Sequence, residues 1–329
     1  MKVRTSHHRA GMTAIDQAYR LAEAGQVRRA VALLKHEGDR GDPAALVELA
    51  AWYLGARYVE RDLQLARQCF GSASKLGHQR ASEIYTNLLA NGTGGTRRWR
   101  EALARLELAG RDDLVATEQR ALLGAMDIDG DGEPRTKPTG QQLSDAPSVM
   151  LFKNFMTSTE CRHLVERAKP GLSPSVVVHP ATGQMVPHPV RTSDNAFFPW
   201  IDEDPVIHVL NRRIAAATAT EASWGEPLQV LRYGPGQEYR PHHDAIAGAD
   251  NQRILTFLVY LNDGYEGGET EFIRTGLKVA GCKGDGLMFR NADDAGRPDP
   301  NAVHAGRPVT AGEKMLATRW IHQRPFGPR

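Results

Sequence analysis

The sequence has few cysteines and no paired metal-binding cysteine motif. Its 329 residues include only three cysteines, Cys69, Cys161 and Cys282, which are widely spaced and form no C-x-x-C pair. An odd count at such spacings argues against a disulfide framework and against a cysteine zinc site. We therefore expect the fold to be held by burial and hydrogen bonds rather than by cross-links.

Long apolar runs and an excess of one charge are also missing. Lys and Arg number 41 and Asp and Glu number 39, which gives a formal net charge of +2. Because nucleic-acid-binding proteins usually carry a stronger basic bias, we expect no nucleic-acid partner. No stretch reaches the roughly 18 uninterrupted apolar residues of a transmembrane helix, so we expect no membrane partner. The basic N-terminal segment lacks the apolar run of a secretory signal, so we expect a cytoplasmic protein.

The first part of the chain has an internal period of 36 residues. Ala30, Ala66 and Ala102 are spaced by this period, and so are Gly41 and Gly77. Small alanines let two helices approach closely, and glycines are common where a helix ends. Because one helix pair cannot bury its apolar face alone, such units stack. The period therefore predicts an α-helical solenoid, which we assign to residues 1–125.

The segment from about Ala30 to Gly110 resembles the Sel1-like branch of tetratricopeptide-type repeats. The stretch that carries the resemblance is AALVELAAWYLGARYVERDLQLARQCFGSASKLGHQRA. The resemblance implies a short solenoid that packs on a partner or on its neighbouring domain. A plain helical bundle with a purely structural role is the alternative.

Residues 126–147 are rich in Gly, Pro, Asp and Thr, which predicts a linker. Asp127, Asp129 and Asp131 match the start of a calcium-binding EF-hand loop. The twelfth position of that loop should be a bidentate Glu, but it is Pro138. We therefore interpret this segment as an acidic turn.

Residues 148–329 form a domain of short β-branched or aromatic segments bounded by Gly, Pro and Asp. A helix is expected to begin near Ser158. The predicted strands are Ser148–Phe152, Leu228–Tyr233, Ile254–Leu261, Thr270–Ile273, Gly286–Phe289 and Lys314–Ile321. Many short strands with Gly-rich turns favour a sandwich or jelly roll. The whole chain is thus predicted to be an α+β multidomain protein.

A group of metal-ligating residue types follows one of these strands. On a strand, residues two apart face the same side, so His242 and Asp244 point together and His243 points away. His304 lies 62 residues after His242. Two histidines and one carboxylate are the ligand set of non-haem Fe(II) oxygenases, in which three positions stay open. Lys314, ten residues after His304, is a cation suited to the far carboxylate of a dicarboxylic cosubstrate.

Residues 150–325 resemble the prolyl 4-hydroxylase branch of the 2-oxoglutarate/Fe(II) dioxygenases. The motifs that carry the resemblance are LQVLRYGPGQEYRPHHDAI, RILTFLVYLNDGYEGGETEF and HAGRPVTAGEKMLATRW, with NFMTSTECRHLVERA upstream. The resemblance implies a double-stranded β-helix of the jelly-roll, cupin-like type. It also implies hydroxylation of an unactivated C–H bond, with a prolyl residue of a peptide or protein as the leading substrate and with release of succinate and CO2. The helical repeats would help to present that substrate.

The same resemblance implies roles for individual residues. The residues that would hold Fe(II) are His242, Asp244 and His304. Lys314 would bind the C5 carboxylate of 2-oxoglutarate, and Tyr233 and Thr270 would add contacts to this cosubstrate. Arg191 would lie near the substrate entrance. The other small molecules implied are O2 and, as reductant, ascorbate.

Two other functions remain open from the residues alone. The first is an interaction or adaptor protein that uses the helical repeats and carries a degenerate oxygenase domain. The intact set of two histidines and one carboxylate argues against degeneracy. The second is another metalloenzyme that places Zn or Mn in the same barrel. Lys314 argues against a hydrolase, because a hydrolase needs no dicarboxylate cosubstrate.

Overall fold

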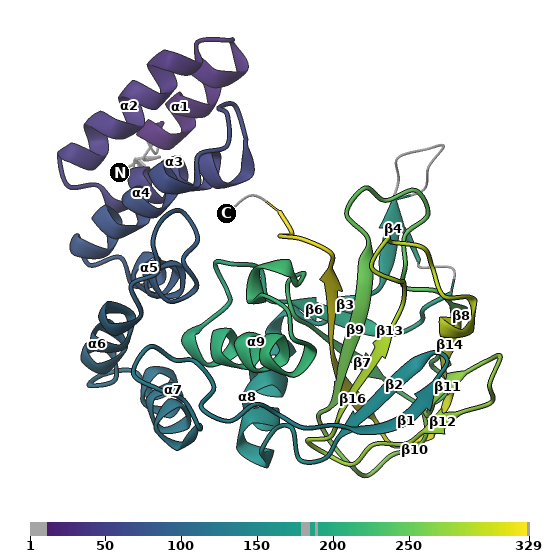
Figure 1. Ribbon diagram of the computed structural model, residues 1–329. Coiled ribbons are helices and arrows are strands. Elements are labelled where there is room, and N and C mark those ends of the chain that lie inside the picture. The colour runs from purple at the N-terminus through teal and green to yellow at the C-terminus, as the bar shows by residue number, and fades with distance from the viewer. Residues whose placement is uncertain (1–11, 179–184, 188–189, 328–329) are drawn as a thin grey trace, which may run out of the picture. The chain divides into compact units, whose positions relative to one another are not determined.

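The computed structural model describes residues 12–178, 185–187 and 190–327, and it divides into two compact units. The first, here called the helical unit, runs to Arg105 (Figure 1). The second, here called the barrel unit, comprises Leu106–Pro328. The division falls inside α6 (Trp99–Ala109), and α7 (Leu114–Ala125) contacts α9 (Pro205–Thr218) of the barrel unit. The domain limits at residues 125 and 147 stay a prediction.

The helices of the helical unit start at intervals that match the sequence period. These helices are α1 (Ala14–Glu23), α2 (Val27–Asp39), α3 (Pro43–Gly55), α4 (Leu63–Lys75) and α5 (Gln79–Asn91). The first residues of α2, α4 and α6 are 36 positions apart, and so are those of α3 and α5. The predicted stack of paired helices is confirmed, whereas its assignment to the Sel1-like branch stays a prediction.

The periodic residues occupy the positions that the stack requires. Ala30, Ala66 and Ala102 are all buried, with at most 1% of each residue exposed. Gly41 and Gly77 end the turns after α2 and α4 with φ of 98° and 85°, a conformation that side chains with a Cβ rarely adopt. Small buried residues and left-handed turns therefore explain why the same positions recur.

The barrel unit contains two antiparallel sheets that face each other. The larger has the strand order β1 (Gln141–Asp145), β2 (Ser148–Phe152), β13 (Gly286–Arg290), β9 (Arg253–Tyr260), β16 (Lys314–His322), β7 (Gln229–Tyr233), β6 (Asp194–Phe197) and β3 (Ser173–Pro174). The smaller has the order β12 (Lys278–Val279), β11 (Thr270–Phe272), β14 (His304–Gly306) and β8 (Tyr239–His242). Every strand predicted from the sequence is present, and the jelly-roll fold is confirmed.

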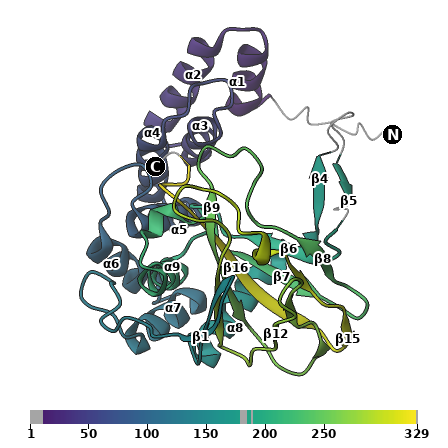
Figure 2. The ribbon, with the colours of Figure 1, turned by 45° about the vertical axis from the view of Figure 1, so that its right-hand side comes forward.

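Two short strand pairs complete the barrel unit. They are β10 (Glu266–Gly267) with β15 (Val309–Ala311), and β4 (Val176–Val178) with β5 (Met185–Pro187). Both ribbon views show β4 projecting from the barrel near β8, and Figure 2 shows β5 beside it. This strand pair therefore extends from the end of the barrel at which β8 lies.

Two helices cover the outer face of the larger sheet (Figure 1). The first, α8 (Ser158–Ala168), begins where the sequence predicts a helix. The second, α9, was not predicted, although it carries recognisable start signals. Asp204 caps it by accepting from the Ile207 backbone N–H at 2.9 Å, and Pro205 is its first residue.

The acidic segment between the helices and the first strand is a turn that bonds to itself. Asp129 Oδ1 accepts hydrogen bonds from the backbone N–H groups of Asp131 and Glu133, both at 2.9 Å. The carboxylate at the centre of the EF-hand-like pattern thus serves the turn's own backbone. The interpretation as an acidic turn is confirmed.

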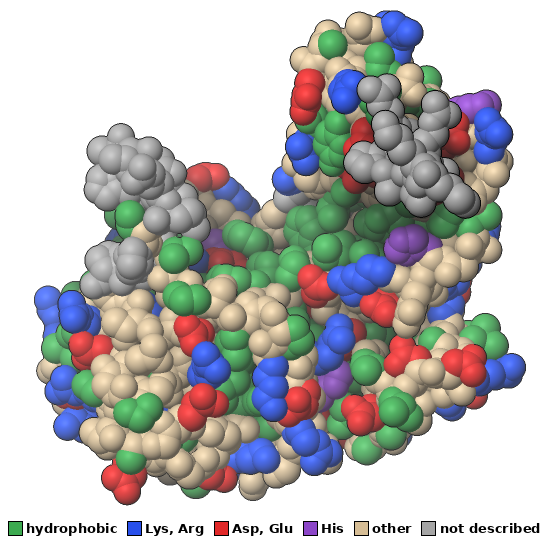
Figure 3. Space-filling model, turned by 180° about the vertical axis from the view of Figure 1, so that it is seen from behind, with side chains coloured by type: hydrophobic (Ala, Val, Ile, Leu, Met, Phe, Trp, Pro, Cys, Tyr) green, Lys and Arg blue, Asp and Glu red, His purple; other side chains and the backbone are tan. Residues whose placement is uncertain are grey.

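No helix in the described part of the chain is long and apolar enough to cross a membrane. On the face shown in Figure 3, basic and acidic side chains are interspersed, and no extended basic patch is visible there. All three cysteines are free thiols.

Candidate active site

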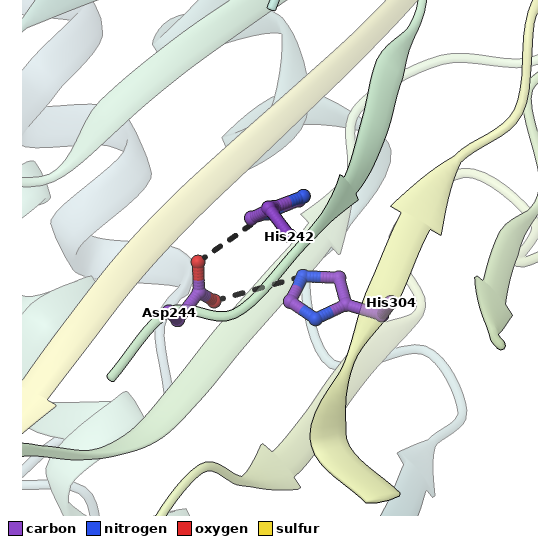
Figure 4. A group of neighbouring side chains, drawn as sticks. All are labelled: His242, Asp244 and His304. Carbon is purple, nitrogen blue, oxygen red and sulfur yellow. Dashed lines mark ion pairs between the residues drawn. The ribbon is translucent and has the colours of Figure 1, made fainter. Parts of the chain in front are cut away.

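Two neighbouring strands of the smaller sheet bring the three predicted ligands together (Figure 4). His242 ends β8, Asp244 follows it by two residues, and His304 begins β14. His304 pairs directly with His242 across the two strands, which explains how residues distant in sequence meet. The possible ligand atoms of the three side chains all lie within 4.8 Å of one another.

Each imidazole is oriented by a backbone carbonyl. His242 Nδ1 lies 2.8 Å from the Arg240 oxygen, and His304 Nδ1 lies 2.9 Å from the Ala302 oxygen. A carbonyl oxygen only accepts, so in the neutral rings Nδ1–H must donate and Nε2 keeps its lone pair. Both Nε2 atoms face Asp244, at 3.4 Å from Oδ1 for His242 and 3.7 Å from Oδ2 for His304. Two lone pairs and a carboxylate converge here, and this donor set fits a divalent cation.

The protonation states also suit metal binding. Burial lowers the pKa of His304 to about 4, although the neighbouring Asp244 opposes this shift. Burial alone would raise the pKa of Asp244, but the two imidazoles and the Thr256 hydroxyl outweigh it and hold the pKa well below its usual range. At neutral pH the site therefore offers a neutral His304 and an ionised carboxylate, the forms in which these groups bind metals.

His242, Asp244 and His304, here called the triad, line a cavity between the two sheets. A buried lysine lies in the same cavity. The cavity holds about 490 Å³ of space without protein atoms, part of it open to solvent. Lys314 is 2% exposed, and its Nζ donates to the Gly268 carbonyl oxygen at 2.5 Å. Burial lowers the pKa of Lys314 to about 8, against a smaller opposing effect of Glu269. Among the described residues no ion pair is formed by Lys314, so this end of the cavity favours an anionic group.

The other two predicted cosubstrate contacts lie at the same end of the cavity. Tyr233 stands opposite Lys314 in the pairing of β7 with β16, and both residues line the cavity. Thr270 Oγ1 lies 3.2 Å from the hydroxyl of Tyr260. Sequence reasoning missed Tyr260, whose ring centre lies 5.4 Å from Lys314 Nζ. Strand alternation offers a signal for it, because Tyr260 lies two residues after Leu258, which lines the cavity, on the buried strand β9.

Arg191, the predicted substrate-side residue, is connected to the triad through a tyrosine that stacks on His242. The Arg191 guanidinium carbon lies 5.5 Å from the centre of the Tyr239 ring. That ring stacks on the imidazole of His242 with 3.4 Å between ring centres. Tyr239 and His242 are an odd number of residues apart, and a bulge between β8 and β14 brings them to one side. Simple strand alternation therefore missed Tyr239.

Comparison with known proteins assigns the family. Residues 228–322 match the family described as the 2OG-Fe(II) oxygenase superfamily. The chain is 37% identical over 201 residues to prolyl 4-hydroxylase 1 of Arabidopsis thaliana, covering 55% of this chain and 71% of that protein. It is 38% identical over 210 residues to probable prolyl 4-hydroxylase 6 of the same organism, covering 56% and 73%.

A solved structure of the viral collagen prolyl hydroxylase of Paramecium Bursaria Chlorella virus-1 is also similar. It shares 30% identity, covers 55% of this chain and 99% of the viral chain, and has a TM-score of 0.45. The curated relatives decide the assignment: this chain belongs to the prolyl 4-hydroxylase family of 2-oxoglutarate- and Fe(II)-dependent dioxygenases. It is an oxidoreductase whose cofactors and cosubstrates are Fe(II), 2-oxoglutarate and O2.

Proposed function

We propose that this protein hydroxylates a prolyl residue of a peptide or protein, with release of succinate and CO2. The observation that carries the proposal is the coexistence of His242, Asp244, His304 and Lys314 in one cavity. Curated relatives that share more than a third of their aligned residues are prolyl 4-hydroxylases, which favours a prolyl substrate. An adaptor with a degenerate oxygenase domain would not need to keep all four side chains.

In this proposal His242, Asp244 and His304 hold Fe(II). Bound Fe(II), together with 2-oxoglutarate and O2, supplies an oxidant able to remove hydrogen from an unactivated C–H bond. The protein contributes fixed ligands, because the carbonyls of Arg240 and Ala302 hold both rings with Nε2 toward the metal. The ionised carboxylate of Asp244 balances part of the metal's charge.

Lys314, Tyr233 and Thr270 are the proposed cosubstrate contacts. Lys314 would pair with the C5 carboxylate, and this pairing would offset the free energy that burial of its ammonium group costs. The cavity wall includes Leu231, Leu258 and Leu316. These apolar side chains would exclude water from the methylene groups of the cosubstrate and strengthen the ion pair.

Arg191 is the proposed substrate-side residue, and its contact with Tyr239 supports a place beside the metal. We further propose that the stacked helices present the peptide or protein substrate, because repeats of this kind offer an extended surface. Ascorbate is the proposed reductant. Three free thiols agree with a reducing compartment, so a cytoplasmic location is proposed.

The test is a panel of proline-containing peptides incubated with the protein, Fe(II), ascorbate and 2-oxoglutarate. We expect a peptide that gains one oxygen atom on proline, with one succinate released for each hydroxylation. Matched peptides with alanine in place of proline, and the His304→Ala variant, serve as controls. Oxygen gained on a residue other than proline would contradict the prolyl assignment while leaving the dioxygenase assignment intact.

A further inference from the structure

Asp244 is held by a chain of two hydrogen bonds that leads away from the metal site into the larger sheet. Thr256 Oγ1 donates to Asp244 Oδ2 at 2.6 Å. Asn291 Nδ2 in turn donates to Thr256 Oγ1 at 2.8 Å. Thr256 is 1% exposed and Asn291 is fully buried. Neither residue belongs to the metal ligands or to the proposed cosubstrate contacts.

The chemistry of the groups determines which atom donates in each of these two hydrogen bonds, which together are here called the relay. A carboxylate only accepts, so the single hydroxyl hydrogen of Thr256 must point to Asp244. The hydroxyl oxygen is then free to accept, and the Asn291 amide fills that position. Because every group is buried, no water competes for these bonds.

The position of Asn291 is held by hydrogen bonds of both its backbone N–H and its backbone carbonyl. Its N–H donates to the Ile254 carbonyl oxygen at 2.8 Å, and its own carbonyl oxygen accepts from the Asp299 N–H, also at 2.8 Å. Thr256 lies in the middle of β9, which pairs with β13 and β16. The relay therefore connects Asp244 to a strand that is paired on both sides.

We infer that Thr256 and Asn291 are positioning residues that make Asp244 offer one carboxylate oxygen to the metal. Each oxygen faces one imidazole, Oδ1 at 3.4 Å from His242 Nε2 and Oδ2 at 3.7 Å from His304 Nε2, but only Oδ2 also accepts the 2.6 Å bond from Thr256, which leaves Oδ1 as the oxygen free to bind the metal. A carboxylate that gripped the metal with both oxygens would occupy a position that cosubstrate and O2 need. The inference rests on the proposed role of Asp244 as a metal ligand.

The three ligands thereby share one design. His242 is oriented by the Arg240 carbonyl, His304 by the Ala302 carbonyl, and Asp244 by the Thr256 hydroxyl. Outer partners of this kind typically change metal affinity about 10- to 100-fold when they are removed. The relay should therefore be detectable in metal binding alone, without cosubstrate or turnover.

The experiment is a titration of the full-length protein with Co(II), in the absence of 2-oxoglutarate, followed by the visible absorption of the bound metal. Thr256→Val removes the hydroxyl at nearly constant volume, and we expect about 10- to 100-fold weaker binding with an altered spectrum. Thr256→Ser keeps the hydroxyl and is expected to restore the spectrum and most of the affinity. Asn291→Leu should fall between them, because Thr256 can still donate.

Thr218→Val is the matched control. The Thr218 hydroxyl on α9 bonds to the Ile214 carbonyl oxygen, far along the chain from the site, so Co(II) binding should not change. Circular dichroism establishes that each variant is folded, and Thr256→Ala replaces Thr256→Val if the latter does not fold.

Folded Thr256→Val with the affinity and spectrum of the unmodified protein would overturn the relay. Thr256→Ser that binds as weakly as Thr256→Val would also overturn it, because packing rather than the hydroxyl would then be responsible. Failure of the unmodified protein to bind Co(II) would instead overturn the metal site itself, and the relay with it.

Discussion

The helical unit and the barrel unit both have an apolar core, but the barrel unit also buries ionisable side chains around its cavity. In the helical unit the most buried residues are apolar, such as Ala30 and Leu49, both fully buried. In the barrel unit the cavity wall includes Asp244, His304 and Lys314, of which no more than 5% is exposed. Burial of apolar groups stabilises a fold, whereas burial of ionisable groups costs free energy unless they are paired.

The difference indicates what each core is built for. Both units gain stability from their apolar cores, while the barrel unit also keeps buried ionisable groups around its cavity because ligands need them. Substitutions in the helical core and in the cavity should therefore have opposite effects on stability and on chemistry. A core change in the helical unit should lower stability and spare the chemistry, and a change in the cavity should do the reverse.

The largest effect is expected from removal of a metal ligand. His304→Ala should lower turnover about 1,000-fold or more, equivalent to roughly 4 kcal/mol, because the metal loses one of three protein ligands. Succinate release measures this loss. His36→Ala, a change of an exposed histidine on α2, should leave turnover unchanged. A His304→Ala variant with near-normal turnover would show that the metal lies elsewhere.

The apolar core should respond in the opposite way. Leu49→Ala is expected to lower the free energy of unfolding of the helical unit by about 3 kcal/mol, through lost burial and the cavity left behind. Urea unfolding followed by tryptophan fluorescence, to which Trp52 in the same core contributes, measures the change. The affinity for 2-oxoglutarate should not move. A parallel loss of that affinity would show that the two units do not act independently.

Replacing Lys314, the buried cation in the cavity, tests the expectation for the barrel unit. Lys314→Met should weaken 2-oxoglutarate binding about 100-fold, or roughly 2.7 kcal/mol, because the carboxylate loses its charge partner. The same change should raise stability by about 1 kcal/mol, because an apolar side chain replaces a buried charge. Calorimetric binding and urea unfolding measure the two effects. Lys169→Met on the surface is the control, and a loss of stability in Lys314→Met would contradict this explanation.

The pH dependence of cosubstrate binding should also depend on Lys314. Its pKa in the free protein is lowered to about 8, and a bound carboxylate favours the protonated form. Affinity for 2-oxoglutarate should thus be nearly constant below about pH 7 and fall as the pH rises through 8, by about 10-fold between pH 7 and pH 9. Lys314→Met should abolish this dependence. A flat profile in the unmodified protein would indicate that Lys314 does not bind the cosubstrate.

The smallest effect is expected from removal of the helical unit. A chain of residues 106–329 should bind 2-oxoglutarate within about twofold of the full-length affinity, because every residue that lines the cavity belongs to the barrel unit. Turnover of a protein substrate should fall if the helices present it. Equal turnover of protein and short-peptide substrates by the shortened, folded chain would contradict the presentation role.

The features that could be predicted from the sequence are those that depend on the spacing of residues along the chain. The period of Ala30, Ala66 and Ala102 defines the helix pairs, because helix contacts recur at fixed spacing. His242 and Asp244 were expected to meet by strand alternation, and they do meet, although β8 ends at His242 and Asp244 lies in the bend that follows. The family resemblance then supplied His304 and Lys314.

What the sequence could not predict depends on contacts across strands. The stack of Tyr239 on His242 needs a bulge, which no local pattern reveals. The bond from Thr256 to Asp244 joins β9 to the loop after β8, and that from Asn291 joins the residue after β13 to β9. Such partners are set by register, which only the folded sheets determine.

The most direct test of the site is anaerobic addition of Fe(II) and 2-oxoglutarate to the purified protein, followed by visible absorption. We predict a charge-transfer band that requires both additions. The band should be absent in His304→Ala and, at matched cosubstrate, lost or greatly weakened in Lys314→Met. Folded protein that gives no band under these conditions would contradict the assignment of this cavity as the oxygenase site.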